Sequence, residues 1–293
     1  MRIQISKFSA SLLVAGLITL PNFVQAQPSA HYAPGTEGLK AASLPPPGLY
    51  LRDYNQFYFS DRMNNAQGDK VGSPEAFVYA NVPRLIWITD TKVLGGYLGV
   101  DALVPLKYTH LQGAGQYFGV GDVFFEGTWS MHLKQWDFAF GAGAWAPTGN
   151  PATRTHPTWA GNGYWTEMLT AGATWYPDEA KRWSLSALNR YEFNQEQQDT
   201  DITIGQAWTL EGGVGYAVSK TLDVGVISYY QQQITANSGS PSSSRNRVAG
   251  VGPEIGAFFP SITLGVSLRY AYEFMAQSRL QGNTITLTLT KVF

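Results

Sequence analysis

The chain has 293 residues, a formal net charge of −1, no cysteine and only 14% charged residues, with nine tryptophans and sixteen tyrosines. The near-neutral charge balance argues against a nucleic-acid-binding protein, and the lack of cysteine excludes disulfides and thiolate metal sites. Because about a quarter of the residues of soluble proteins are charged, the shortfall indicates a surface that largely faces hydrocarbon.

Residues 1–26 have the features of a cleavable secretion signal. Arg2 and Lys7 form a basic head, an apolar run follows, and residues 24–26 read Val-Gln-Ala, an A-x-A-like cleavage site. We expect the mature chain to begin at Gln27. Because the signal carries two bases and no acid, the mature net charge becomes −3.

Residues 27–47, called here the N-terminal segment, show no strand pattern. Pro45, Pro46 and Pro47 follow one another, and three consecutive prolines cannot donate the hydrogen bonds of a sheet. Two placements remain open for this segment. It either threads the lumen of a barrel as a small plug or lies at the periplasmic mouth.

From residue 48 onward most of the chain alternates between apolar and polar residues, which is typical of membrane-spanning β-strands. The stretches 49–61, 75–89 and 163–176 are poorly sorted, and their faces are not assigned. The pattern is clearest in residues 97–108, 121–134 and 262–276. In the last stretch one face carries Ile262, Leu264, Val266, Leu268, Tyr270, Tyr272, Phe274 and Ala276, and the other carries Arg269, Glu273 and Gln277. No run after the signal is long and apolar enough for a spanning helix, so a closed barrel is the remaining way to cross lipid.

The connections alternate in length, as they do in outer-membrane barrels. Short links are predicted at 90–92, 134–135, 177–182, 219–220 and 259–261, and longer polar segments at 61–74, 109–117, 147–163, 194–201, 234–246 and 277–282. Five short and six long connections join about twelve strands. An even number places both termini on the periplasmic side.

The chain ends on an alternating strand whose last residue is Phe293. Ile285, Leu287 and Leu289 share its apolar face, and threonines occupy the other. A terminal aromatic is the feature that the barrel-insertion machinery reads, so this machinery is an expected partner. Lys291 replaces the aromatic usual two residues before the end, and we expect its ammonium to reach water at the periplasmic rim.

Several short motifs together resemble an outer-membrane family named for the meta-pathway of phenol degradation. They are Pro-Pro-Pro-Gly-Leu-Tyr-Leu-Arg-Asp-Tyr-Asn at 45–55, Gly-Val-Gly-Asp at 119–122, Ala-Pro-Thr-Gly at 146–149, Val-Gly-Pro-Glu-Ile-Gly at 251–256 and the closing strand. The resemblance implies a barrel that admits small, often aromatic or hydrophobic compounds and is distantly similar to long-chain fatty-acid channels.

Charged residues on the predicted inner face are candidates for lining a pore. They are Asp101, Lys107, Asp122, Glu126, Arg190, Glu211, Asp223, Glu254, Arg269 and Glu273. A constriction carrying both signs of charge would orient polar solutes. The alternative is a closed salt-bridge network that fills the lumen. Most aromatics are expected in interfacial girdles, with Trp145, Trp165 and Trp175 as possible substrate contacts.

An enzymatic role is considered and disfavoured. Ser130 and His132 share a face, as in outer-membrane lipases, but their strand places them at the periplasmic rather than the outer rim. The glycine clusters near residues 113–121 and 250–256 lack the strand-turn-helix context of nucleotide sites. No metal or cofactor is predicted.

The sequence therefore predicts an all-β protein, a closed antiparallel transmembrane β-barrel of about twelve strands over residues 48–293. The expected location is the outer membrane, with outer-membrane lipid and a small organic solute as further partners. The expected function is passive uptake of small organic compounds. The alternatives are a closed structural or adhesion barrel and, third, a lipase-type enzyme.

Overall fold

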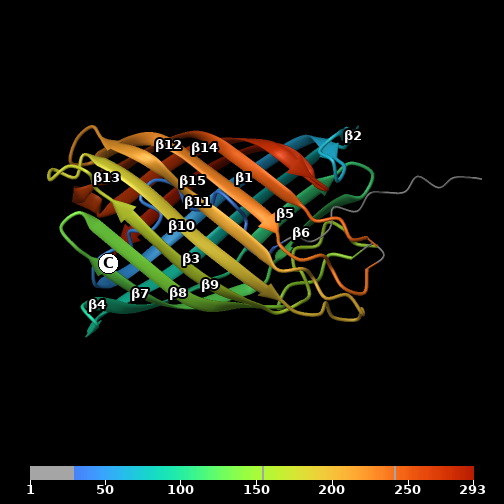
Figure 1. Cartoon of the computed structure of the whole chain (residues 1–293), viewed down its shortest axis with the longest axis horizontal. Helices are drawn as coiled ribbons and strands as arrows, with labels where there is room; N and C mark the ends of the chain where they lie inside the picture. The colour runs from blue at the N-terminus through green and yellow to red at the C-terminus, as the bar shows by residue number, and fades with distance from the viewer. Residues whose placement is uncertain (1–29, 154, 241) are drawn as a thin grey trace, which may run out of the picture.

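The computed structural model describes residues 30–293 except residues 154 and 241, so the predicted signal at 1–26 lies outside the described residues. The described chain forms a closed antiparallel barrel of twelve wall strands (Figure 1). The strand that closes the sequence pairs with the strand that opens the barrel, so the wall has no free edge. This confirms the predicted fold class and strand number.

The strands, named as in Figure 1, are numbered along the chain. They are β1 (Gly48–Asn64), β2 (Lys70–Gly72), β3 (Ala76–Val93), β4 (Gly96–Leu103), β5 (Leu106–Leu111), β6 (Gly115–Val120), β7 (Val123–His132), β8 (Trp136–Ala146), β9 (Thr166–Trp175), β10 (Trp183–Asn194), β11 (Ala207–Ala217), β12 (Leu222–Gln233), β13 (Arg247–Phe259), β14 (Leu264–Gln277) and β15 (Leu280–Val292). None of the described residues forms a helix long and apolar enough to cross a membrane.

Each wall strand pairs with its neighbours in sequence, and β1 pairs with both β15 and β3. The hairpin β5–β6 continues the hairpin β4–β7 beyond a break at residues 104–105 and 121–122, so these four segments make two wall strands. Pro105 interrupts the first of them because it has no backbone donor for the ladder. Strand β2 is a short addition at the rim beside β1.

The two ends of the barrel differ in their connections (Figure 1). One end carries the short links at 94–95, 133–135, 176–182, 218–221 and 260–263, together with the C-terminus; we call it the turn end. The other carries the larger connections at 147–165, 195–206 and 234–246, and we call it the loop end. The predicted alternation of short and long connections is confirmed in part, because the loop-end connections at 112–114 and 278–279 are as short as the turns.

Side chains alternate between an apolar outer surface and a polar interior, the reverse of a soluble protein. Leu85, Trp87, Phe140 and Leu169 are about half exposed on the outside. The interior buries polar and charged side chains, among them Asp101, Glu126, Thr170, Arg190, Glu192, Glu211, Glu254, Arg269 and Glu273. Period-two alternation on a closed sheet produces this division directly.

Strands β1 and β3 carry a polar cluster on their outer face, which explains why the sequence pattern was hard to sort there. The Asn81 side-chain amide donates to Asp53 at 2.8 Å and to Asn55 at 3.2 Å, and the Tyr79 hydroxyl donates to Asn55 at 2.8 Å. Mutual hydrogen bonding lowers the cost of placing these groups outside the lumen. The inner face of the same two strands carries Arg52 and Arg84.

Some predicted boundaries are wrong because polar residues continue in the ladder. The link expected at 90–92 is strand, and the turn lies at Leu94–Gly95, where both residues have positive φ as in a type I′ turn. The loop expected at 109–117 shrinks to 112–114, and the one at 277–282 shrinks to 278–279. Conversely, residues 202–206 belong to a connection and not to β11.

The predicted faces of β14 fail at its end. Met275 has φ of 56° and is exposed, whereas Ala276, expected on the outer face, is buried. The pairing with β13 shifts register at the same place. A bulge residue in the left-handed region inserts one position and so exchanges the two faces.

Candidate functional site

The described part of the N-terminal segment, residues 30–47, runs inside the barrel from the loop end to the turn end, where it joins β1 (Figure 1). His31 contacts the loop-end termini of β9 and β7 through Thr166 and Asp122, and Tyr50 at the turn end donates to the Pro46 carbonyl. Residues 30–44 therefore lie in the lumen, and the segment reaches the turn-end mouth at residues 45–47, where Pro46 is exposed. For the described residues, these contacts favour a plug over a segment confined to the mouth.

The first anchor of the segment is Glu192 on β10. Its Oε1 accepts hydrogen bonds from the backbone N–H groups of His31 at 2.8 Å and Tyr32 at 3.1 Å. The His31 ring bridges Asp122 at 2.9 Å and Thr166 at 2.7 Å. It also stacks on Trp145, with ring centroids 5.4 Å apart. Backbone and ring together fix the segment near the loop end.

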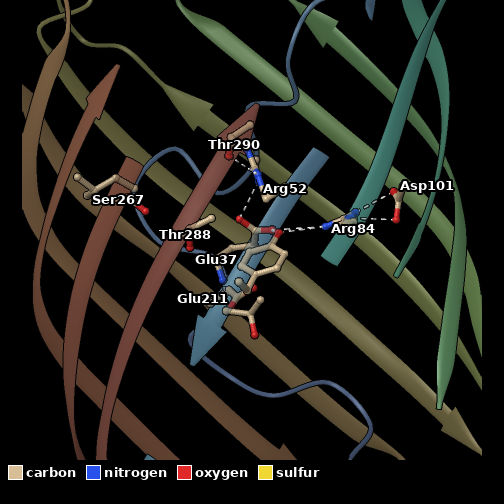
Figure 2. A network of polar contacts seen from close by, with 12 residues as sticks. Glu37, Arg52, Arg84, Asp101, Glu211, Ser267, Thr288 and Thr290 are labelled. Carbon is tan, nitrogen blue, oxygen red and sulfur yellow. Dashed lines mark hydrogen bonds and ion pairs between the residues drawn. The ribbon is translucent and has the colours of Figure 1, made fainter. Parts of the chain in front are cut away.

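The second anchor is Glu37, which lies between two arginines of the wall. Arg52 donates to Glu37 at 3.2 Å and Arg84 at 3.4 Å, and the Tyr54 hydroxyl donates at 2.5 Å. Arg84 continues to Asp101 through two parallel hydrogen bonds of 2.9 and 2.8 Å, as Figure 2 shows. The planar guanidinium group suits such a bidentate pair. Glu37 thus joins the segment to β1, β3 and β4.

Glu211 on β11 holds the segment from the opposite wall. It pairs with Arg190 and accepts a hydrogen bond from the Tyr32 hydroxyl, and its other oxygen accepts from the Gly35 amide at 3.0 Å. The Arg190 guanidinium lies over the Tyr32 ring, 4.0 Å from its centroid. Gly35 has φ of +79°, and a Cβ there would lie 2.6 Å from the Tyr229 ring. Only glycine fits that position without strain.

A hydrogen bond, an ion pair and two apolar contacts fix the segment toward the turn end. Glu254 accepts from the Leu39 amide at 2.9 Å, and Lys40 pairs with Asp223 at 2.8 Å. The Leu39 side chain packs against the buried cluster around Ile227, and Ala42 packs with Leu188. Charged residues of the wall therefore bind the segment at positions 31, 35, 37, 39 and 40, and apolar contacts add to this at Leu39 and Ala42.

Two cavities remain in the lumen. The loop-side cavity has a volume of about 250 Å³ and is lined by Tyr32, Lys107, Asp122, Phe124, Trp145 and Met168 among others. The turn-side cavity has a volume of about 350 Å³ and is lined by residues 37–41 and 43–45 with Asp101, Asp223, Glu254 and Arg269 among others. Arg84, Glu126 and Arg190 line both cavities. These three side chains and the N-terminal segment separate the two spaces.

The family described as "Putative MetA-pathway of phenol degradation" matches residues 60–289, which is most of the chain. The chain belongs to this family. The match confirms the resemblance drawn from the short motifs. No curated protein matches the sequence.

Solved structures of other proteins have the same fold as this family member. The COG4313 outer membrane channel from Pseudomonas putida F1 superposes with a TM-score of 0.77 at 16% identity, covering 89% of this chain and 100% of that chain. The beta domain of the Bordetella autotransporter BrkA superposes with a TM-score of 0.51 at 14% identity, covering 84% and 99%. At these identities the likeness concerns the fold: an outer-membrane β-barrel.

The ten predicted inward residues of this phenol-degradation family member all face the lumen. Asp101, Lys107, Asp122, Glu126, Arg190, Asp223, Glu254 and Arg269 line one or both cavities. Glu211 anchors the N-terminal segment, as described above. Glu273 lies apart from the cavities, where it accepts from Tyr58 at 2.9 Å and pairs with Arg279 at 3.6 Å. A role for any of them in permeation stays a prediction.

Of the three tryptophans considered as substrate contacts, one faces the lumen. Trp145 is buried and lines the loop-side cavity. Trp165 and Trp175 are 44% and 39% exposed on the outer surface, and they line neither cavity. A place in the interfacial girdle fits these two better than contact with a solute in the lumen.

The sequence interpretation missed the wall arginines that hold the N-terminal segment. Arg52 and Arg84 lie in strands whose outer faces carry polar residues, so the two faces could not be told apart. A period-two run of long polar and aromatic side chains on β1, at Tyr50, Arg52, Tyr54, Gln56 and Tyr58, was the available signal. Glu37 and Lys40 gave no such signal because their segment has no regular structure.

The Ser130 and His132 pair does not form a catalytic arrangement. The Ser130 hydroxyl is buried and has no hydrogen-bond partner among the described residues, and His132 pairs instead with Asp137 at 2.9 Å. Both lie toward the end of β7 that leads into the turn at 133–135.

Proposed function

We propose that this barrel is a passive outer-membrane channel for small organic solutes, aromatic or hydrophobic compounds among them, and that it is not an enzyme. The observation that supports this most directly is the pair of cavities, one on each side of the N-terminal segment, with Arg84, Glu126 and Arg190 between them. A structural barrel has no need of an apolar space beside a polar one. Family membership is consistent with a channel.

We assign the loop end to the outside of the cell and the turn end to the periplasm. Outer-membrane barrels have short periplasmic turns and longer outer loops. Phe293 lies at the turn end and is 69% exposed, so the insertion machinery could reach it from the periplasm. Lys291 donates to the Ile262 carbonyl at 2.7 Å and to Thr263 at 2.8 Å, which accounts for a lysine at this rim.

In the proposed route a solute enters the loop-side cavity, passes the constriction formed by Arg84, Glu126 and Arg190, and leaves through the turn-side cavity. Arg84 donates a hydrogen bond to Glu126 at 3.3 Å across this constriction, and the N-terminal segment occupies the rest of it. Passage requires a shift of side chains or of the segment itself. The segment thus acts as a plug that sets which solutes cross.

The second candidate is a closed structural barrel, and the density of anchors on the N-terminal segment favours it. The side chains of Glu37 and Lys40 are bound to wall side chains, and so are the backbone amides of His31, Tyr32, Gly35 and Leu39. A segment held in this way could serve only to fill the lumen. The two candidates differ in whether solutes cross at all.

Liposome swelling separates these candidates. Purified protein is reconstituted into vesicles, which are then exposed to iso-osmotic benzenesulfonate, arabinose or sucrose. The sulfonate stays ionised at neutral pH, so none of these solutes crosses bare lipid rapidly. A channel gives swelling in benzenesulfonate and arabinose that falls with solute size. Swelling equal to that of empty vesicles for every solute would establish the closed barrel instead.

A further inference from the structure

The loop-side cavity has the composition of a binding site for a small ring. Tyr32, Leu103, Phe124, Trp145 and Met168 form one buried apolar cluster along its wall. The Phe124 and Trp145 rings lie 4.7 Å apart by their centroids. A volume of about 250 Å³ is below that of pockets for drug-sized ligands, so it suits a molecule with a single ring.

The acidic groups that line this cavity are already satisfied. Asp122 accepts from His31 at 2.9 Å, from the Gly149 amide at 2.9 Å and from the Asn162 amide at 2.7 Å. Glu126 accepts from Arg84 at 3.3 Å and from the Thr170 hydroxyl at 2.8 Å. Neither carboxylate needs a cation from a ligand.

The donors that line the cavity are not satisfied. Lys107 on β5 has no hydrogen bond or ion pair among the described residues, and the Trp145 indole N–H is buried without an acceptor. The residue paired with Lys107 on β6 is Gly119, which has no side chain that could bind the ammonium group. The nearest acid of the cavity, Asp122, is already bound to His31, Gly149 and Asn162. An ammonium group with no directly bound anion in a largely apolar space is costly, and a ligand with a negative charge would lower that cost.

We propose that the loop-side cavity binds a single-ring organic anion such as an aromatic carboxylate. The ring packs against Phe124 and Trp145, and the carboxylate pairs with the Lys107 ammonium. This inference rests on the proposed function, because it names the class of solute that a channel with this cavity would select. It is tested by binding, which does not require transport.

The test measures binding to the purified full-length barrel in detergent by calorimetry and tryptophan fluorescence. Benzoate is compared with benzyl alcohol, which keeps the ring and loses the charge, and with acetate, which keeps the charge and loses the ring. Benzoate should bind most tightly. Lys107→Met should weaken benzoate binding by about tenfold or more, because charge-assisted hydrogen bonds are about twice as strong as neutral ones, and should leave benzyl alcohol nearly unchanged.

Two further variants guard against a merely structural effect. Lys107→Arg keeps the charge and should retain most of the benzoate binding. Lys220→Met removes a lysine that lines the turn-side cavity and should have no effect. Equal affinity of Lys107→Met and the parent for benzoate, or equal affinity of the parent for benzoate and benzyl alcohol, would overturn the inference. Benzoate binding without vesicle swelling would instead refute the channel and keep the site.

Discussion

Glu37 is the residue on which the seating of the N-terminal segment depends most. It is the only acidic residue between positions 30 and 47, and it contacts Arg52, Arg84 and Tyr54 together. Burial by itself would raise the pKa of its carboxyl group, but the charges of Arg52 and Arg84 outweigh burial and lower the pKa to about 2. The carboxylate is therefore ionised and strongly bound under ordinary conditions.

Glu37→Gln should destabilise the barrel by about 3 kcal/mol at pH 7, the free energy that corresponds to a pKa lowered from 4.5 to about 2. The glutamine keeps the size of the side chain and removes the charge that Arg52 and Arg84 face. Urea unfolding from lipid vesicles measures the change. Glu179→Gln is the matched control, since its ion pair with Lys134 is largely exposed and should contribute little. Equal losses of unfolding free energy in Glu37→Gln and Glu179→Gln would contradict the role of Glu37 as a buried anchor.

We also expect the difference in stability between the parent protein and Glu37→Gln to depend on pH. A carboxyl group whose pKa is lower in the folded state stabilises the fold above its unfolded pKa and loses that contribution as pH falls through its folded pKa. The parent should therefore exceed Glu37→Gln in stability by a constant amount above pH 4.5, and the difference should vanish as pH approaches about 2. Unfolding curves at several pH values measure the difference. If the difference in unfolding free energy stayed constant down to pH 2, ionisation of Glu37 would not be its cause.

At the scale of single strands, much could be predicted from the sequence because period-two alternation depends only on neighbouring positions. The inner faces of β4, β7 and most of β14 follow from it directly. The bulge at Met275 does not, because a residue at positive φ leaves no mark in the alternation until the faces have exchanged. Contacts of the N-terminal segment also could not be predicted, since His31 and Glu192 lie 161 positions apart.

Strand β15 carries the prediction that concerns assembly. Phe293 closes this strand and is exposed at the turn end, where its amide donates to the Leu49 carbonyl at 3.1 Å. Phe293→Ala should lower the amount of barrel assembled in the outer membrane several-fold and leave the stability of the folded barrel almost unchanged. Heat-modified migration on gels counts the folded fraction in cells, and urea unfolding checks stability. A folded fraction equal to that of the parent would show that Phe293 is not needed for insertion.

At the scale of the whole molecule, the N-terminal segment acts as the core that a narrow barrel would otherwise lack. The wall presents charged and polar side chains inward, and burying them without partners would be costly. The segment supplies backbone donors to Glu192, Glu211 and Glu254 and an acid to Arg52 and Arg84. In the proposed channel, filling the lumen and controlling passage would therefore be two consequences of the same contacts.

A reversible tether between segment and wall decides whether the segment moves during passage. The chain contains no cysteine, so a pair introduced at Ala42 and Ser186 can react only with itself. The Ala42 amide lies 3.1 Å from the Ser186 hydroxyl, which places the two side chains near disulfide range. If the segment shifts to let solutes pass, the oxidised Ala42→Cys, Ser186→Cys protein should swell vesicles more slowly than its reduced form.

Reduction should restore the rate of the parent, and Ala42→Cys alone should respond to neither oxidant nor reductant. The oxidised tether should also raise the melting temperature, because it restricts the unfolded chain over a long loop. Equal swelling in the oxidised and reduced states would show that the segment is stationary. Solutes would then have to pass beside it, through rearrangement of Arg84, Glu126 and Arg190 alone, since these side chains line both cavities.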